Sequence, residues 1–461
     1  MSVSNPANPI LAAWSATLAR RGAEAAILAA DGSRLRTFRE VESEAVELAG
    51  LLRGCVSPGV VAIQMGNDPR LPALLLALWR HRLIPVLFDL SLERESLANA
   101  IATSHAAALI ARRDGHLAIS ATPMPAAPPP DADFLKLTSG TTGAPRAIRF
   151  TAAQLLADCE AVCDTMGITA ADVNFGVIPW SHSYGFSNLV TPLLCRGVSL
   201  VATGDSLPRA ILNGLAHSGA TVFPGLPVFF QKLAELHAPL LPHLRLCISA
   251  GAPLPAATAR AFREKFGVKI HGFYGSSECG GIAYDATPGE TPEGCVGAPM
   301  RGVRLEFESE SDPSRISVHG AAVGGGYFPD SDASLTPGRF APGDLVRRTP
   351  HGIVLAGRVS DFINVAGRKL NPAEIETTIR ACPGVRDVVV FGVASALRGE
   401  EPVACVCGTA NAAALQAHCA NALPAWQVPR DFWLVESLPV SERGKLSRSA
   451  IAEAYGLRPR G

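Results

Sequence analysis

The sequence predicts an α/β fold with at least two domains, and three observations support this. With 461 residues, the chain is too long for one ordinary core. Between about residues 38 and 274, short runs of branched apolar residues alternate with segments of helical spacing, which predicts parallel sheets with helices on both faces. A smaller set of helices and strands follows from Asn371. We expect a large N-terminal domain of layered β/α subdomains over residues 1–357 and a small α+β domain over residues 358–461.

The first alternating block follows from its periodicity. Apolar residues at helical spacing predict a helix over Phe38–Leu52, and the apolar run Leu71–Trp79 predicts a buried one. That run is far too short to span a bilayer. Branched apolar residues predict strands at 60–63, 84–88 and 107–110.

A Pro-rich connector at 121–131 leads into a predicted hairpin. Its strands are expected at 133–137 and 147–150, on either side of a glycine-containing loop. A second β/α block runs from about 152 to 274, and residues 296–319 turn to strand patterning. In the small domain, the patterns predict helices over 372–382, 411–422 and 447–455, and strands over 386–393, 402–408 and 431–436.

Composition narrows the function classes. Lys+Arg and Asp+Glu both number 41, so nothing favours nucleic acid or an anionic membrane as a partner. The 11 cysteines form no CxxC pair, which favours reduced thiols in a cytosolic compartment over disulfides or a zinc site. Cys405 and Cys407 are expected on one face of a core strand. Because the first 20 residues lack a basic start and a continuous apolar core, we expect a cytoplasmic protein without a signal peptide.

The most informative stretch is the loop of the predicted hairpin. Glycines, hydroxyl-bearing residues and a cation lie close together, so backbone N–H groups, hydroxyls and charge can turn toward a polyphosphate. The Walker spacing with its terminal Gly-Lys-Ser/Thr is missing, and a flexible surface turn is the alternative interpretation. The residues concerned are Thr138, Ser139, Gly140, Thr141, Thr142, Gly143 and Arg146.

This loop resembles the phosphate loop of the adenylate-forming superfamily, which includes acyl-CoA synthetases, peptide-synthetase adenylation domains and firefly-type luciferases. That loop usually reads Thr-Ser-Gly-Ser/Thr-Thr-Gly-x-Pro-Lys-Gly. Here Arg146 replaces the lysine and Ala147 replaces the last glycine. Arginine keeps the charge and adds a bidentate fork. Further motifs in the family's order extend the resemblance over roughly residues 20–455.

Two of these motifs concern the nucleotide. Gly251-Ala252-Pro253 follows a predicted strand at 244–248 and, by the resemblance, lies along the adenine; a simple strand-to-helix turn is the alternative. The run from Tyr274 through Ser277 to Glu278 is similar to the family's Tyr-Gly-x-Thr-Glu. The resemblance implies that the tyrosine stacks on adenine while the hydroxyl and the carboxylate meet phosphate and Mg²⁺, a hard cation that prefers oxygen ligands.

The remaining motifs lie toward the C-terminus. By the resemblance, Asp344 accepts hydrogen bonds from the ribose hydroxyls and Arg358 contacts ribose or phosphate. Ser360 occupies the position about which the family's small domain rotates, where Asp or Lys is usual, and Gly367 lines the pantetheine tunnel. Lys445 matches the lysine that reaches the active site for adenylation. Without the resemblance, Gly343-Asp344 would be interpreted as a turn, and Lys445 beside Gly444 as part of a solvated loop.

The acid is read from residues 179–186, which resemble the family's Pro-x-x-His-x-x-Gly wall between acyl pocket and adenylate. His182 gates that wall or orients the carboxylate, and a core histidine is the alternative. In peptide-synthetase domains an aspartate in this motif pairs with the substrate amine, and this stretch has none. This argues against an amino acid as substrate. Since nothing resembles the tryptophan that shortens the acetate pocket in acetyl-CoA synthetases, we expect an apolar acid larger than propionate, fatty or aromatic.

The resemblance implies an AMP-forming acid–thiol ligase, with Lys445, Glu278, Ser277 and His182 as catalytic residues. ATP, Mg²⁺ and CoA are the expected cofactor and co-substrates, and the acid is the other small-molecule partner. Two alternatives stay open. The acyl group passes instead to the phosphopantetheine of a carrier protein, or the chain binds a nucleotide without turnover as a regulatory protein.

Overall fold

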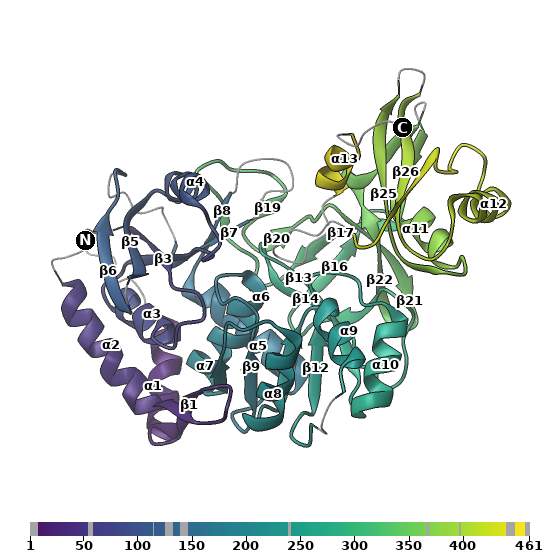
Figure 1. Cartoon of the computed structure of the whole chain (residues 1–461). Helices are drawn as coiled ribbons and strands as arrows, with labels where there is room; N and C mark the ends of the chain where they lie inside the picture. Colours follow the sequence, from purple (N-terminus) through teal and green to yellow (C-terminus); the bar gives the residue numbers. More distant parts are fainter. Residues whose placement is uncertain are drawn as a thin grey trace. The chain divides into compact units, whose positions relative to one another are not determined.

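The computed structural model divides the chain into two compact units (Figure 1). The large unit contains residues 1–306, 317–341 and 350–353, and the small unit contains 307–316, 342–349 and 354–461. The structure describes residues 8–53, 59–113, 115–124, 132–138, 146–237, 241–365, 368–395, 398–438 and 448–456.

One sheet of the large unit carries the predicted hairpin. Strands β5, β3, β4 and β7 are parallel to one another, as the β/α alternation predicts, while β6 and β8 return antiparallel as hairpins. Strand β5 follows α4 (Arg94–Ser104) and pairs parallel with β3, which confirms the predicted continuation of the alternation, whereas β6 was not predicted. The sheet order is β18 (Gly326–Phe328), β8 (Ala147–Phe150), β7 (Phe134–Leu137), β4 (Ile84–Leu87), β3 (Val60–Gln64), β5 (Ala106–Arg113) and β6 (His116–Ala121).

The helices of this block follow the predicted ranges closely. A capping box formed by Thr37 and Glu40 starts α2 (Phe38–Leu52). Every residue of Leu71–Trp79 in α3 (Leu71–Arg80) is buried, as its uniform apolar sequence predicts. Helix α2 packs on α3, and α4 (Arg94–Ser104) contacts β7.

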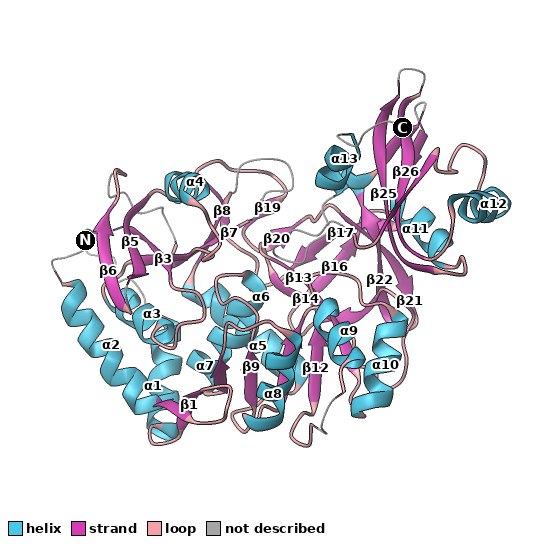
Figure 2. Ribbon diagram, in the orientation of Figure 1, coloured by secondary structure: helices cyan, strands magenta, loops and turns pink. Residues whose placement is uncertain are grey.

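The second sheet of the large unit contains the strands of the second predicted block. Its strands from β13 to β1 are parallel to one another, and helices connect β9, β10, β11, β12 and β13 along the chain (Figure 2). The order is β15 (Cys295–Pro299), β14 (Gly280–Tyr284), β13 (Ile270–Ser276), β12 (Leu246–Ser249), β11 (Val222–Gly225), β9 (Val173–Gly176), β10 (Ser199–Ala202), β1 (Ala25–Leu28) and β2 (Arg34–Thr37).

Helices connect these strands and pack on one another, notably α1 and α5 against α7. The N-terminal helix α1 and the β1–β2 hairpin were not predicted. The elements are α1 (Pro9–Arg21), α5 (Ala152–Met166), α6 (Ser183–Gly185), the π-helix η1 (Phe186–Val190), α7 (Thr191–Arg196), α8 (Pro208–His217), α9 (Pro227–Glu235) and α10 (Ala256–Phe266), with the short strands β19 (Leu335–Thr336) and β20 (Arg339–Phe340).

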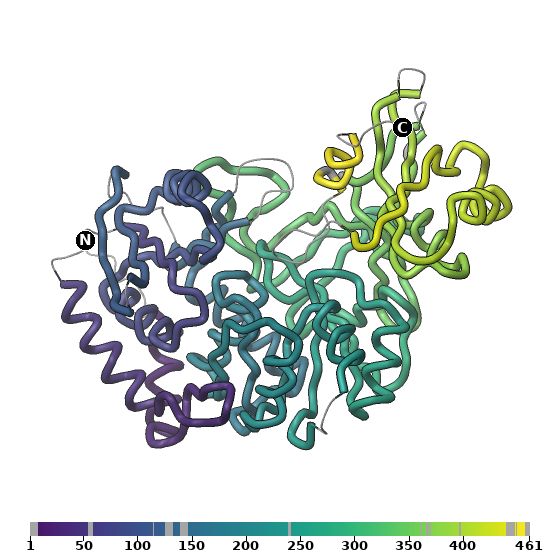
Figure 3. Tube along the Cα trace, viewed as in Figure 1, coloured from purple at the N-terminus to yellow at the C-terminus, as the bar shows by residue number. Residues whose placement is uncertain are grey.

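The small unit, coloured green to yellow in the tube of Figure 3, has its own sheet and apolar cores. Strands β25 and β26 are antiparallel, and β27 pairs parallel with β26. Asn371 caps α11 with Pro372 in the first turn, as predicted. The elements are η2 (Val359–Asp361), β23 (Ile363–Val365), β24 (Arg368–Leu370), α11 (Pro372–Arg380), β25 (Val385–Ser395), β26 (Gly399–Gly408), α12 (Ala412–Ala422), β27 (Asp431–Val435) and α13 (Arg448–Gly456).

Strands β16 (Arg304–Phe307), β17 (Ser314–His319), β21 (Asp344–Thr349) and β22 (Gly352–Arg358) complete the described elements. Cys405 and Cys407 lie in β26 and belong to the same apolar core, which confirms their predicted place on one face of a core strand. The mixed α/β architecture, with a large unit and a smaller one, confirms the predicted fold class. Among the described residues, no helix is both long and apolar enough to cross a membrane.

Candidate active site

The predicted phosphate loop joins two paired strands. Leu137 of β7 stands opposite Ala147 of β8, so the loop closes a hairpin as predicted. At its base, the Thr138 N–H donates to the Arg146 carbonyl at 2.9 Å, and the Arg146 N–H donates to the Thr138 hydroxyl at 3.3 Å. The predicted residues Ser139, Gly140, Thr141, Thr142 and Gly143 lie outside the described residues.

Arg146, the cation of this loop, is held in place by two partners. Its guanidinium donates to the Asp332 carboxylate at 2.9 Å. The guanidinium carbon also lies 3.5 Å from the centre of the Tyr327 ring, within the range of a cation–π contact. Both partners come from the segment around β18, which pairs with β8. The cation therefore has a fixed position at the end of the hairpin.

Glu278 lies in the turn between β13 and β14, and Tyr327 reaches it too. The Tyr327 hydroxyl donates to Glu278 Oε1 at 3.1 Å, so one tyrosine contacts both the loop cation and the predicted metal ligand. Burial raises the pKa of Tyr327 to about 12, so this hydroxyl stays a donor at neutral pH. The Gly324 N–H donates to the Glu278 carbonyl at 2.8 Å and fixes the backbone of the turn.

Ser277, beside Glu278, connects this turn to the predicted acyl wall. Its hydroxyl accepts from the Ser183 hydroxyl at 2.9 Å. In the wall itself, His182 Nε2 lies 2.7 Å from Asp89 Oδ2. This hydrogen bond from His182 holds the pKa of Asp89 well below its usual range. The imidazole therefore has a carboxylate partner, which argues against a histidine that merely fills the core.

A single amide side chain anchors the same wall. The Asn67 side-chain N–H₂ donates to the carbonyls of Gly176, Ile178 and Thr203, and its oxygen accepts from the Trp180 backbone N–H at 2.8 Å. Trp180 is fully buried beside this anchor. Removing its ring would open a cavity as well as change the wall.

The predicted adenine residues lie at the carboxyl ends of neighbouring parallel strands. Gly251, Ala252 and Pro253 follow β12 and are exposed, and Gly251 takes a φ of +86° that favours glycine. Tyr274 lies in β13, beside β12, and its residue surface is only 6% exposed. Carboxyl ends of parallel strands are where open α/β sheets bind ligands.

In the small unit, two predicted residues form a pair. Arg358 donates to Asp344 at 2.6 Å, and Asp344 is 8% exposed. Ser360 lies in the short helix η2, and nothing is described of its side chain. Arg448, which the sequence did not single out, donates to Asp361 at 2.6 Å and to Glu376 at 2.7 Å. Gly367 and Lys445 lie outside the described residues.

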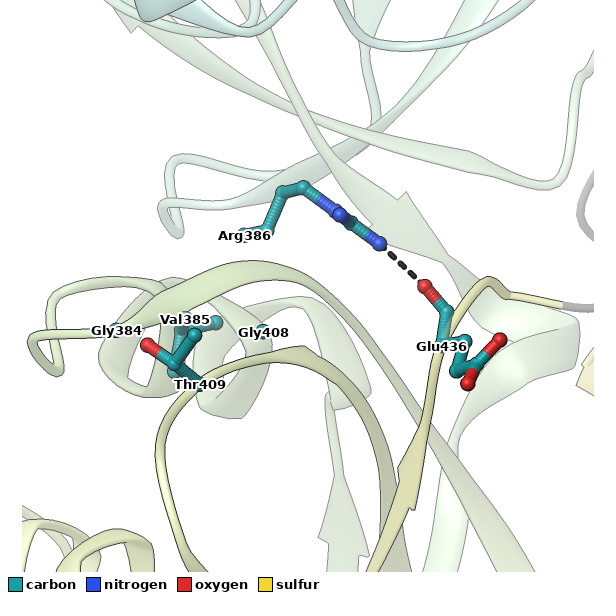
Figure 4. Close-up of a pocket in the computed structure, with 6 residues that line it drawn as sticks. All are labelled: Gly384, Val385, Arg386, Gly408, Thr409 and Glu436. Carbon is teal, nitrogen blue, oxygen red and sulfur yellow. Dashed lines mark hydrogen bonds between the residues drawn. The ribbon is translucent and has the colours of Figure 1, made fainter.

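A hollow of about 600 Å³ lies on the small unit (Figure 4). Arg386 crosses it to donate to the backbone carbonyl of Glu436. It contains none of the predicted site residues, and its lining is Gly384, Val385, Arg386, Gly408, Thr409 and Glu436.

Sequence reasoning missed the partners that hold these residues in place. Asp89 is the second residue after strand β4, and its position at the carboxyl end of a parallel strand was the available signal. Tyr327 and Asp332 lie far along the chain from the residues they contact, and no local pattern points to them.

The chain matches two families along its length. Residues 14–328 match the family described as AMP-binding enzyme, and residues 374–445 match the AMP-binding enzyme C-terminal domain. It is 30% identical to sulfoacetate–CoA ligase of Cupriavidus necator, covering 71% of this chain and 68% of that protein. It is 27% identical to a long-chain-fatty-acid–CoA ligase of Bacillus subtilis, covering 71% and 62%.

A further relative is much longer than this chain. Naringenin synthase of Pestalotiopsis fici is 29% identical over 71% of this chain, which spans only 13% of that protein. Among solved structures, ATP-bound MatB from Rhodopseudomonas palustris has a TM-score of 0.86 at 24% identity, covering 97% of this chain and 99% of that one. The Bacillus subtilis o-succinylbenzoate CoA synthetase, in complex with its acyl-adenylate, has a TM-score of 0.80 at 21% identity, covering 95% and 97%. These likenesses concern the fold.

Proposed function

Because the chain belongs to the AMP-binding enzyme family, we propose that it activates a carboxylic acid with ATP and transfers the acyl group to the thiol of CoA. The first half-reaction joins the carboxylate to the α-phosphate, and pyrophosphate leaves. In the second, the thiol attacks the acyl-adenylate, and AMP leaves. The reaction turns an oxide, a poor leaving group, into a good one.

One observation supports this proposal above the others. Tyr327 joins the cation of the phosphate-loop hairpin to the carboxylate of the Tyr-Gly-Ser-Ser-Glu turn: Arg146 lies over its ring, and Glu278 accepts from its hydroxyl. Charge builds on phosphorus and on the departing pyrophosphate during adenylation. Fixed cations and N–H donors near that charge lower the barrier, because they need no reorganisation when the charge develops.

The residues present fit Mg²⁺, since this ion is usually held by one or two carboxylates together with substrate phosphates. Glu278 would hold it. Oε1 accepts from Tyr327, and none of the ion pairs among the described residues involves Glu278. When bound, the ion neutralises phosphate charge. Tyr327 orients the carboxylate, and Arg146 with the hydroxyl of Thr138 faces the anionic substrate.

In the small unit, we assign Asp344 and Arg358 to the ribose and its phosphate. The guanidinium orients the carboxylate, whose oxygens can accept from hydroxyl donors. Lys445 supplies a further cation during adenylation, and Gly367 lines the path of the thiol. We propose that residues 358–461 turn about Ser360 between the half-reactions, since the lysine and the thiol path cannot serve the same site together.

For the acid, we propose an apolar fatty or aromatic substrate larger than propionate. The wall at 179–186 has no carboxylate of its own to pair with a substrate amine. Asp89 approaches this wall, but His182 already occupies its Oδ2. The relatives are named for acids as different as sulfoacetate and long-chain fatty acids, so sequence identity to them does not select an acid. The composition of the wall is what supports this choice.

Two other functions remain as alternatives. In the first alternative, an acyl carrier protein is the acceptor instead of CoA. In the second, the chain binds a nucleotide without turnover. The connected Arg146, Tyr327 and Glu278 support turnover, because they keep together the cation and the carboxylate that adenylation needs at the phosphates.

Acid-dependent exchange of labelled pyrophosphate into ATP tests the proposal. The panel should contain straight-chain acids from acetate to palmitate, benzoate, anthranilate and amino acids. We expect exchange with an apolar acid and none with amino acids. If none of these acids supports exchange, the nucleotide-binding alternative is favoured. The protein is then given the acid that supports exchange, together with either CoA or a holo-carrier protein. The thiol on which the thioester forms identifies the acceptor.

A further inference from the structure

Beneath the phosphate-loop hairpin, the large unit buries a lysine that the proposed chemistry does not use. Lys136 lies in β7, two residues before Thr138, and is 5% exposed. Its ammonium donates to the Ser187 hydroxyl at 3.4 Å and lies 4.6 Å from the ring centre of Phe150. Burial lowers the pKa of this lysine, and the nearby charge of Asp158 opposes that shift. A charge placed this way is costly unless a partner offsets it.

The partner is a carboxylate on helix α5. Ser187 donates to Asp158 Oδ2 at 2.5 Å, and Asp158 is 3% exposed. Its other oxygen, Oδ1, accepts from the Gly281 N–H at 3.0 Å. Gly281 is the third residue after Glu278, at the start of β14. The hydrogen bonds therefore run from the hairpin strand, through the π-helix and α5, to the start of β14, just after the turn that carries the predicted metal ligand.

The backbone of the turn is shaped to meet this carboxylate. Gly280 has a φ of +68°, and a Cβ there would lie 2.0 Å from Asp158 Oδ1. Any side chain at this position would collide with the carboxylate or push the turn away from it. Contact between Asp158 and the turn thus requires glycine for space as well as for conformation.

A second buried carboxylate provides a comparison. Asp172 is 4% exposed and pairs with Arg245 at 2.6 Å. It immediately precedes Val173, the first residue of β9, and accepts from Thr221, just before β11. It therefore lies at the amino ends of parallel strands, whereas the site residues follow the carboxyl ends. Both aspartates stabilise the fold, but only Asp158 contacts the backbone beside Glu278.

We propose that Asp158 is a positioning residue that fixes Glu278 relative to the phosphate-loop hairpin. It does so by accepting from the Gly281 N–H, while its other oxygen accepts from Ser187, whose hydroxyl in turn accepts from Lys136. This inference rests on the proposed function, since it assigns Asp158 to the placement of the metal ligand. Loss of Asp158 should weaken metal binding by more than its effect on stability explains.

Three variants test this: Asp158→Ala, Asp158→Asn and the control Asp172→Ala. Each is measured for its melting temperature, for the Mg²⁺ concentration that gives half-maximal pyrophosphate exchange, and for binding of Mn²⁺·ATP without acid by electron paramagnetic resonance. Asp158→Ala should raise the half-maximal Mg²⁺ concentration by about 10–100-fold, the usual loss when an outer partner of a metal ligand is removed. Asp158→Asn should recover most of this, because its amide oxygen still accepts from Gly281. Asp172→Ala should lower only the melting temperature.

A second pair of variants covers the case in which Asp158→Ala does not fold. Gly280→Ala introduces the collision and leaves Asp158 in place. Gly267→Ala is its control, since Gly267 has a φ of +72° but nothing within 4 Å of an added Cβ. Both variants impose similar backbone strain. Only Gly280→Ala should weaken Mn²⁺·ATP binding and raise the Mg²⁺ requirement.

Equal Mg²⁺ requirements in Asp158→Ala and Asp172→Ala would overturn the inference, as would equal binding in the two glycine variants. If none of the acids supports pyrophosphate exchange in the wild-type protein, that result counts against the proposed function instead. In that case, Mn²⁺·ATP binding still decides whether Asp158 positions Glu278.

Discussion

Two carboxylates with predicted nucleotide roles are held in opposite ways. In the large unit, Glu278 accepts from the neutral phenol of Tyr327 at 3.1 Å. In the small unit, Asp344 accepts from the cationic Arg358 at 2.6 Å. A phenol orients a carboxylate without neutralising it, whereas a guanidinium compensates its charge. Glu278 is therefore suited to a cation, and Asp344 to neutral hydroxyl donors such as those of ribose.

The cations differ between the regions as well. In the large unit, Arg146 already pairs with Asp332, so part of its charge is compensated before substrate arrives. The backbone hydrogen bond from Ser334, followed by that from Arg146, lowers the pKa of Asp332 to about 2, so this carboxylate is ionised at neutral pH. The transition state of adenylation thus requires cationic charge from elsewhere, and in our assignment Lys445 supplies it.

The largest expected effect follows from this need. Lys445→Ala should lower pyrophosphate exchange by roughly 10²–10³, the scale of losing one preorganised donor. Thioester formation from a supplied acyl-adenylate should stay near the wild-type rate. Lys232→Ala is the control, because Lys232 pairs with Glu235 on the surface of α9. Equal losses in both half-reactions would contradict the assigned role and leave Arg146 as the principal cation.

The next test removes charge from Glu278 alone. Glu278→Gln keeps an oxygen that can accept from Tyr327 but loses the negative charge. We expect pyrophosphate exchange at fixed Mg²⁺ to fall by about 10², as for loss of a group that places charge at the transition state. The Mg²⁺ requirement should rise. If a titration with Mg²⁺ gives the same midpoint in wild type and variant, then Glu278 does not hold the ion.

Sequence patterns predicted the elements well where the signal is local. Helices α2 and α3 match the predicted ranges because an apolar stripe, or a wholly apolar surface, fixes a helix against its core. By contrast, β1 is a strand of four residues whose parallel partner, β10, lies far along the chain. Its pairing is a tertiary event, so local patterning could not reveal it.

The candidate site shows the same division. The loop and the Tyr-Gly-Ser-Ser-Glu motif are contiguous and could be read directly. Their supporting contacts are not: Asp332 is 186 residues from Arg146, and Asp89 is 93 residues from His182. Polar residues such as these are common on surfaces, so only the fold distinguishes them as partners.

A smaller effect is expected when the partner of Asp344, and not Glu278, is changed. Arg358→Met removes the cation from Asp344 and leaves a poorly exposed carboxylate without that partner. We expect the KM for ATP to rise by about tenfold, in line with loss of one charge-assisted hydrogen bond. The Mg²⁺ midpoint should not move, in contrast to Glu278→Gln. A shift of the Mg²⁺ midpoint in Arg358→Met would remove the distinction between the two regions.

The smallest expected effect concerns Tyr327, which contacts both Arg146 and Glu278. Tyr327→Phe keeps the ring 3.5 Å from the guanidinium carbon but removes the hydroxyl that orients Glu278. A net hydrogen bond contributes about 1 kcal/mol, so the Mg²⁺ requirement should rise by about fivefold while the KM for ATP stays unchanged. Tyr327→Leu also removes the cation–π contact, so it should raise both quantities. If the two variants behave alike, then the ring and the hydroxyl act together, and Glu278 is not oriented separately from the loop cation.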